Sequence, residues 1–236
     1  WPFVRMLALF GTLPVLSMRN VPARVRVALA LFITLCAQPS LPDIPVVALD
    51  SAVALMVLLQ QVLIGISLGF AARIVFAAVE FAGELAGLQM GMNFAMFFDP
   101  TTGGQATAVS RFFGVTVGWL FIVINGHLLF IAALIRSFQT FPVSAEPFGF
   151  LRATQPQVWG AEIFALGLWI ALPLLAMLLF VNLMLGVISR VAQQMNIFAI
   201  GFPITLGAGL VGVLLTLPMF QVPMTLALER MLGHFL

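Results

Sequence analysis

The residues best suited to chemistry in this sequence are Arg73, Glu80 and Glu84, which stand in an otherwise apolar stretch. On a helix, Glu84 lies one turn after Glu80 and Arg73 lies two turns before Glu80, so the side chains share one face. Charges in apolar surroundings are costly unless they pair or meet water. The set is therefore either a proton relay or a group of buried or lumen-facing structural charges. We favour the second interpretation, because no second titrating site for a relay is evident.

Other residue types give no catalytic, cofactor-binding or metal-binding pattern. Neither His127 nor His234 has a Ser or Cys placed as in a hydrolase, and no pair of ligands has the spacing of a metal site. Cys36 is the single cysteine, and all ten basic residues are Arg, which excludes a P-loop lysine. An intramembrane enzyme using His127 and Asp99 is the weakest hypothesis, since nothing positions a nucleophile beside them.

The composition indicates which solvent surrounds these residues. Of 236 residues, 62% are hydrophobic and only 8% are charged, whereas soluble domains carry about 25% charged residues. The net charge of +2 is spread along the chain, so nucleic-acid binding is not expected. The sequence predicts a membrane or membrane-assembly protein in contact with lipid. Because the chain begins at Trp1 without a methionine, inside an apolar segment, we expect that its natural start lies upstream.

An all-α architecture of about six apolar helices follows from the apolar stretches, because no period-two alternation indicates a barrel. The expected helices cover residues 1–16, 25–37, 46–70 with its continuation 73–98, 112–135, 163–188 and 197–220. A spanning helix needs roughly 20 residues, so the 13 residues of Val25 to Ala37 are too few and the 53 of Val46 to Phe98 too many for simple spans. Short and overlong segments together predict helical hairpins that pack on partner proteins.

Glycines recur at a spacing of four within the apolar stretches. Gly83, Gly87 and Gly91 form one such row, and Gly65 with Gly69 form another. On a helix this spacing creates a groove into which another backbone can come close. The groove serves packing either within the chain or against a partner, and the sequence leaves both open.

Large, deformable apolar side chains precede a predicted helix end and a Gly-rich loop. Methionine fills irregular gaps, and apolar constrictions close pores by excluding water, so the loop is a candidate pore plug; ordinary core packing is the other interpretation. Proline disfavours helical backbone in the residue before it, so the helix is expected to end at the aspartate. The segment consists of Met90, Met92, Phe94, Met96, Phe97, Phe98, Asp99, Pro100, Gly103 and Gly104.

A polar segment separates the last two apolar stretches. It contains Arg190, Gln193, Gln194 and Asn196. These side chains need water or polar partners, so we expect a hairpin turn in which Arg190 is a buried or lumen-facing charge.

Three longer segments, in matching order, resemble the FliR family of flagellar export-gate proteins, namely residues 81–100, 125–128 and 189–203. The resemblance covers essentially the whole chain. It implies a single domain over residues 1–236, in which a FliP-like part (1–137) is followed by a FliQ-like part (138–236), within a membrane-associated hetero-oligomeric export gate.

The resemblance also implies a function. A member of this family is a channel-forming subunit of the flagellar type III export gate, through which unfolded flagellar subunits cross the bacterial inner membrane within the flagellar basal body. The implied partners are FliP and FliQ, with FlhB and FlhA in addition, and the chain is then a conduit component without a cofactor, not an enzyme. A plug loop of the family maps onto about Asn93 to Ser110.

Two alternatives to this function remain. One is the related export-gate subunit of virulence-associated injectisomes. The other is a proton-coupled secondary transporter that uses Arg73, Glu80 and Glu84.

Overall fold

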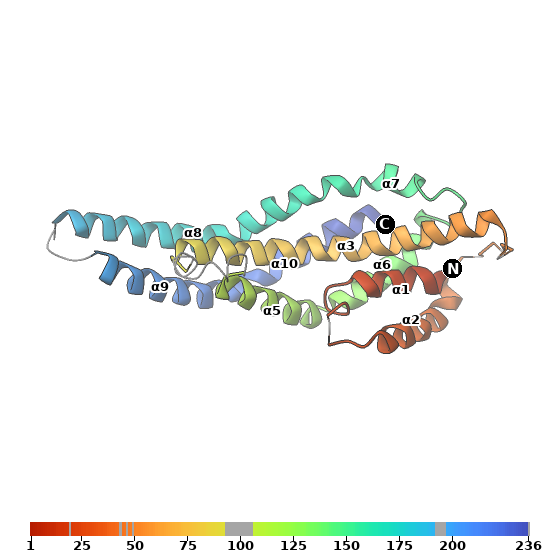
Figure 1. The fold of residues 1–236 in the computed structure, drawn as a ribbon, viewed down its shortest axis with the longest axis horizontal. Coiled ribbons are helices and arrows are strands. Elements are labelled where there is room, and N and C mark those ends of the chain that lie inside the picture. The colour runs from red at the N-terminus through yellow and green to blue at the C-terminus, as the bar shows by residue number, and fades with distance from the viewer. Residues whose placement is uncertain are drawn as a thin grey trace. The chain divides into compact units, whose positions relative to one another are not determined.

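The computed structural model describes residues 1–18, 20–42, 44–45, 47–48, 50–92, 106–191 and 197–235. Within these residues the fold is all-α, as the sequence predicts (Figure 1). Its α-helices are α1 (Pro2–Thr12), α2 (Ala23–Ala37), α3 (Ala52–Gln89), α5 (Ala108–Val123), α6 (Gly126–Thr140), α7 (Gly149–Thr154), α8 (Gly160–Val191), α9 (Ile197–Thr216) and α10 (Gln221–Leu232). Short 3-10 turns are η1 (Gln38–Ser40), η3 (Pro156–Val158), η4 (Leu217–Phe220) and η5 (Gly233–Phe235).

The apolar helices differ in number and length from the expected six. In the described part of the chain, three stretches are long and apolar enough to cross a membrane: Ala52–Gln89, Gly160–Val191 and Ile200–Phe235. The two expected helices on either side of residue 72 are one helix, α3, because no proline interrupts it. The expected helix over residues 112–135 is instead two, α5 and α6, bent by 65°.

A left-handed residue causes that bend. Asn125 has a φ of 57° and precedes the first residue of α6. Asparagine tolerates this conformation better than most residues. Gly126 follows, and a Cβ there would lie 2.5 Å from the Phe121 ring. The Asn-Gly pair therefore turns the chain where apolar composition alone predicts a continuous helix.

The chain forms two compact units, each assembled from separated stretches. Unit 1 consists of Trp1–Phe76, Leu120–Ala161 and Thr225–Leu236; unit 2 consists of Ala77–Trp119 and Glu162–Met224. Each unit draws on both of the sequential parts that the resemblance implies, residues 1–137 and 138–236. That division remains a prediction.

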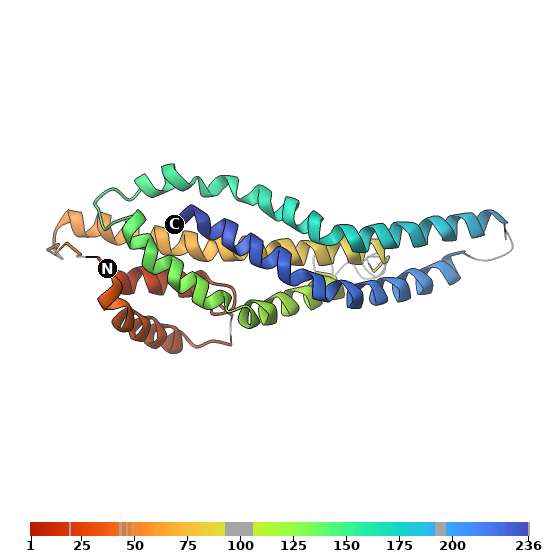
Figure 2. The ribbon, with the colours of Figure 1, turned by 180° about the vertical axis from the view of Figure 1, so that it is seen from behind.

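In unit 1, α1 packs closely on α2 and on the first part of α3. A Cβ at Gly65 would lie 2.7 Å from Ala8 Cβ, and a Cβ at Gly69 would lie 2.6 Å from Thr12 Cβ. Both glycines therefore allow α1 to approach the α3 backbone. Near the C-terminus, η5 lies beside α6, as the view from behind shows (Figure 2).

A buried arginine joins three stretches of unit 1. Arg5 is fully buried; its Nε donates to Gln61 Oε1 (2.8 Å), its Nη1 to Ser137 Oγ (2.9 Å) and its Nη2 to the Phe141 carbonyl (3.0 Å). The guanidinium also lies 3.7 Å from the centroid of the Phe138 ring. Hydrogen bonds and a cation–π contact compensate for the loss of water around this cation.

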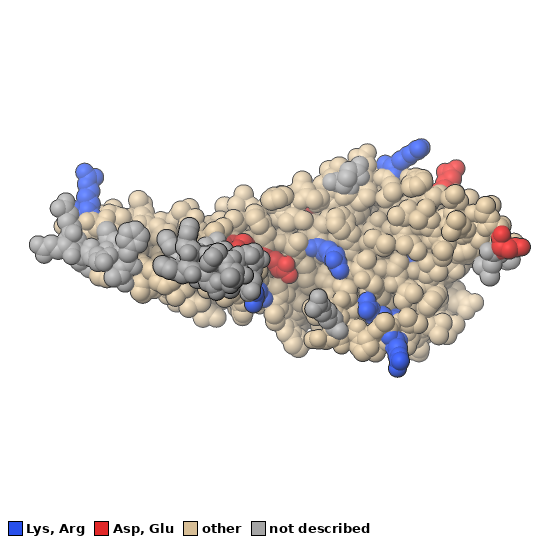
Figure 3. All heavy atoms as spheres, viewed as in Figure 1, with Lys and Arg blue, Asp and Glu red and all other residues tan. Residues whose placement is uncertain are grey.

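In unit 2, α8 and α9 run side by side (Figure 1). A Cβ at Gly212 of α9 would lie 2.6 Å from Leu174 Cδ1 of α8, so these two helices touch closely. The Phe113 and Phe220 rings meet edge to face, with centroids 4.9 Å apart. Few charged side chains appear on the face in Figure 3, as the 8% charged composition requires.

Candidate functional site

The candidate site lies in unit 2, where the end of α3 and the start of α5 flank residues 93–105. The chain leaves α3 through a Schellman motif: Gly91 N–H donates to the Leu88 carbonyl and Met92 N–H to the Gly87 carbonyl, both at 3.0 Å. Gly91 has a φ of 75°, a conformation that glycine adopts without a Cβ penalty. The direction in which the chain leaves α3 is therefore fixed.

Glu84 holds the other flank of the same segment. Its Oε2 accepts hydrogen bonds from the Thr107 backbone N–H (3.1 Å) and from the Thr107 hydroxyl (3.2 Å). The Thr107 oxygen in turn accepts from Ser110 N–H at 3.2 Å, so Thr107 caps α5. A carboxylate beside the first turn of α5 also complements the positive end of the helix dipole. Glu84 is thus an anchor for residues that lie 23 positions away.

Glycines bring α3 and α5 together at this point. A Cβ at Gly83 would lie 2.7 Å from Ser110 Cα, and a Cβ at Gly87 would lie 2.6 Å from Thr107 Oγ1. The first neighbour is backbone and cannot move aside easily. Gly83 and Gly87 therefore face another part of the same chain, whereas Gly91 ends the helix instead of continuing their row.

Glu80 supports the contact between the helices. Its backbone carbonyl accepts a hydrogen bond from Ser110 Oγ (2.9 Å). Its side chain lies against α5, since a Cβ at Gly114 would be 3.0 Å from Glu80 Oε1.

The two methionines before residue 93 differ in burial. Met90 is fully buried, and its side chain fills the space beside Gly209 of α9, where a Cβ would lie 2.5 Å from Met90 Cγ. Met92 is half-buried. The rest of the predicted plug lies outside the described residues: Phe94, Met96, Phe97, Phe98, Asp99, Pro100, Gly103 and Gly104.

The two arginines of the predicted charge set have separate places. Arg73 belongs to unit 1, where its Nε donates to the Thr12 carbonyl at 2.8 Å and its Nη2 to Ser17 Oγ at 3.3 Å. It thereby satisfies a carbonyl at the end of α1. Arg190 is exposed in the last turn of α8, where a cation complements the negative end of the helix dipole.

Thr107 and Ser110 are hydrogen-bond partners of Glu84 and Glu80 that the sequence does not predict. A Thr directly before an apolar run is a helix N-cap signal. That signal indicates where α5 begins. It does not indicate that Glu84 reaches the cap.

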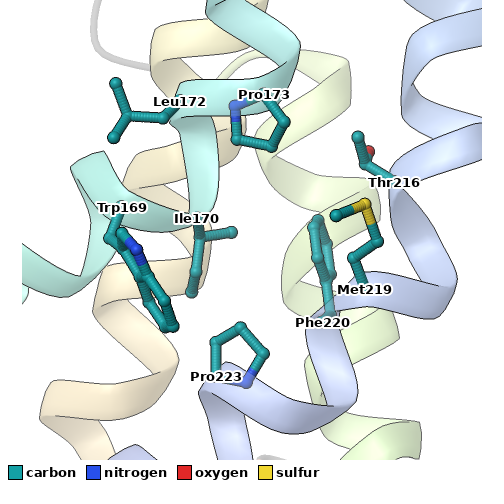
Figure 4. A pocket seen from close by; sticks show the side chains of 8 residues that line it. All are labelled: Trp169, Ile170, Leu172, Pro173, Thr216, Met219, Phe220 and Pro223. Atoms are coloured by element: carbon teal, nitrogen blue, oxygen red, sulfur yellow. The ribbon is translucent and has the colours of Figure 1, made fainter.

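Unit 2 also contains an apolar cavity of about 270 Å³ (Figure 4). Side chains of α8 line one side of it, and those of α9, η4 and α10 line the other. Pro173 interrupts the hydrogen bonding of α8 at this level. The Thr216 hydroxyl donates to the Gly212 carbonyl at 2.9 Å. The cavity is therefore a space between interrupted helices, with no polar group positioned for a reaction.

The geometry of the candidate site serves positioning. The Glu84 carboxylate accepts two hydrogen bonds from Thr107. No group of three or more His, Cys, Asp or Glu side chains gathers for a metal ion anywhere among the described residues. The arrangement fixes both flanks of residues 93–105 against each other.

Fold and composition define a class: an all-helical membrane protein in which hydrogen bonds hold the residues on either side of positions 93–105. The sequence matches the bacterial export proteins, family 1, over residues 1–231. It is 45% identical over 222 residues to the flagellar biosynthetic protein FliR of Pectobacterium carotovorum subsp. carotovorum, covering 93% of this chain and 84% of that protein. The FliR proteins of Escherichia coli (strain K12) and Bacillus subtilis (strain 168) are 46% and 30% identical, each covering 89% of this chain and 80% and 82% of their own lengths.

The chain therefore belongs to family 1 of the bacterial export proteins, the family that includes these FliR proteins. The predicted resemblance is confirmed. The coarse function follows: the chain is a flagellar biosynthetic protein of the export apparatus, with apolar helices long enough to span a membrane.

Proposed function

We propose that the chain is a channel-forming subunit of the flagellar type III export gate and that the predicted plug segment, about Asn93 to Ser110, closes the channel through its residues before Thr107. In this proposal, unfolded flagellar subunits pass through the gate across the bacterial inner membrane, within the flagellar basal body. The Met and Phe side chains of the plug exclude water when no substrate is present.

The hydrogen bonds that hold the residues on either side of positions 93–105 carry the proposal. A reversible plug must return to one position, so both of its ends need firm attachment. Gly91 fixes one end through the Schellman motif, and Glu84 fixes the other through Thr107. Large apolar side chains between two fixed ends suit a seal better than a flexible linker.

Exposed apolar helix faces support the proposed hetero-oligomer. In α8, the most apolar window has a mean hydropathy of 2.5, yet only 28% of that window is buried within the chain. Uncovered apolar surface of this extent marks contact with protein or lipid. We assign FliP and FliQ as the neighbouring subunits, FlhB and FlhA as further partners, and membrane lipid for the remaining surface.

The test replaces the plug aromatics and measures leakage. In assembled gates, Phe94→Ala combined with Phe97→Ala and Phe98→Ala should make membranes permeable to small ions or solutes. Assembly, followed by co-purification, should be unchanged. The matched control is Phe148→Ala, just before α7, which removes an exposed ring outside residues 93–105 and should cause no leak. An assembled triple variant without a leak would remove the plug from the proposal.

The proton-coupled transporter receives less support. Its carboxylates should be free to exchange protons, yet Glu84 accepts two hydrogen bonds from Thr107. Arg73, for its part, binds a carbonyl of α1. Substrate uptake by the purified chain alone, abolished by Glu84→Gln, would reverse this preference.

A further inference from the structure

A larger apolar cavity lies in unit 1, beside the bend between α5 and α6. Its volume is about 550 Å³, within the range of roughly 300–1,000 Å³ that ligand pockets occupy. The end of α1, the segment after it, one face of α2 and both sides of the bend form its walls. Among the described residues that line it, His127 is the one with a polar side chain.

The bend explains why this space is not filled by the chain. Asn125 turns the backbone, so Ile122 and Leu128, from either side of the turn, line the cavity together. Protein interiors are close-packed and contain few voids larger than a water molecule. The space is partly open at the surface of the unit, so an apolar chain can enter it from outside. An apolar occupant is therefore expected.

A cation with an unsatisfied donor lies on the same face of α2 as the cavity. Leu29 and Ile33 line the cavity, and Arg26 precedes them by three and seven residues, which places it on their side of the helix. Within the described residues, Arg26 Nε is the one buried side-chain nitrogen or oxygen without a hydrogen-bond partner. A buried donor of a charged group requires an acceptor.

The walls of the cavity favour an anion as that acceptor. The first acidic residue of the chain is Asp43, so the sequence that contributes α1 and α2 contains only positive charges. The stretch from Leu120 to Ala145, on both sides of the bend, also lacks acidic residues. Arg73 adds a cation next to the lining segment through its hydrogen bond to Ser17. Basic pockets between membrane helices bind anionic lipid headgroups.

We propose that this cavity binds an acyl chain of one anionic phospholipid, whose phosphate pairs with Arg26. The apolar walls take the chain, and the guanidinium satisfies its buried Nε–H on a phosphate oxygen. A neutral hydrophobic molecule leaves that donor unpaired. A phospholipid accounts for both the apolar lining and the unpaired Arg26 Nε, and phospholipids surround any membrane protein.

The first experiment measures lipid retention. The full chain, with the subunits that co-purify with it, is extracted from membranes in mild detergent, and retained phosphatidylglycerol is quantified by mass spectrometry. Arg26→Ala should lower retention about tenfold, as the loss of a charge-assisted hydrogen bond predicts. The matched control, Arg24→Ala, removes an exposed cation from the same turn and should leave retention unchanged. Equal retention in wild type and Arg26→Ala, or equal losses in both variants, overturns the proposal.

A second variant tests the acyl-chain site itself. Ile131→Trp fills the cavity and should abolish specific retention while the helices stay folded. If it expels a partner subunit and leaves lipid retention unchanged, a protein side chain occupies the cavity and the lipid proposal is wrong.

Delipidated wild-type protein provides a measurement that does not depend on how variants fold. Phosphatidylglycerol added to it should raise the Tm by more than phosphatidylcholine does, because a ligand that binds only the native state stabilises it. Equal shifts with the two lipids contradict the proposed phosphate contact.

Discussion

Helices α3 and α8 look alike in sequence but are covered differently in the structure. They contain 38 and 32 residues, and their apolar windows have mean hydropathies of 2.2 and 2.5. Yet 67% of the window is buried in α3 and only 28% in α8. Hydropathy therefore shows that a helix avoids water. It does not show whether its own chain or something else covers it.

Glycine surroundings show the same difference at single positions of the two helices. On α3, Gly69 and Gly83 each stand where another segment of the chain comes within contact distance. On α8, a Cβ at Gly167 would likewise lie 2.7 Å from the Ala78 carbonyl oxygen, but no atom of the described residues lies within 4 Å of a Cβ built at Gly186. In α3 these glycines admit neighbouring backbone, whereas Gly186 faces open space that we assign to partners or lipid.

The largest effect is expected from enlarging these glycines. Gly83→Leu should unfold the chain or cost more than about 3 kcal/mol, because its Cβ would overlap the Ser110 backbone. Gly186→Leu should leave the fold intact, since its Cβ meets no atom of the described residues. Thermal unfolding and protease resistance in detergent measure both. Similar losses of stability in the two variants would contradict the difference between Gly83, which contacts its own chain, and Gly186, which contacts none of the described residues.

A smaller effect separates two neighbours on α8. Leu178 is fully buried and Leu179 is 55% exposed. Leu178→Ala should lower the free energy of unfolding by about 2–5 kcal/mol because it leaves a cavity, and Leu179→Ala by less than about 0.5 kcal/mol. Denaturant unfolding gives both values.

Leu179→Ser should instead reduce co-purification with partner subunits. Unchanged assembly would mean that this face of α8 has no protein neighbour.

The smallest effect is expected at the hydrogen bonds between Glu84 and Thr107. Glu84→Gln keeps an acceptor oxygen but removes the charge, so the anchor to Thr107 should weaken by about 1 kcal/mol. Hydrogen exchange at the Thr107 and Ser110 amides should then be about fivefold faster. Thr116→Val on the outer side of α5, which removes a bond only to the Phe112 carbonyl, serves as the control. Equal protection in wild type and Glu84→Gln would show that the carboxylate does not hold this flank.

The fold class was predictable from the sequence because composition alone requires backbone groups to be satisfied inside helices. The residues at which helices begin and end were harder to predict from the sequence. The absence of proline between Ala52 and Gln89 allows one long helix, but periodicity offered no reason to join the two expected ones. The bend at Asn125 was marked by an Asn-Gly pair, a turn signal that the surrounding apolar residues concealed.

The site was predictable only in part, for a similar physical reason. The cost of charge in apolar surroundings singled out Glu84, but its partner Thr107 lies 23 residues away, beyond any local pattern. Arg5 is the stronger case, because its acceptors on Gln61, Ser137 and Phe141 are 56, 132 and 136 residues distant. Only the tertiary fold brings such groups together.

The composition of the particle extracted from membranes tests the central claim most directly. We predict that the chain, solubilised in mild detergent and sized with its molecular mass determined, runs inside a larger hetero-oligomer whose other subunits cover α8. A folded, monodisperse particle containing this chain alone would contradict the gate-subunit account.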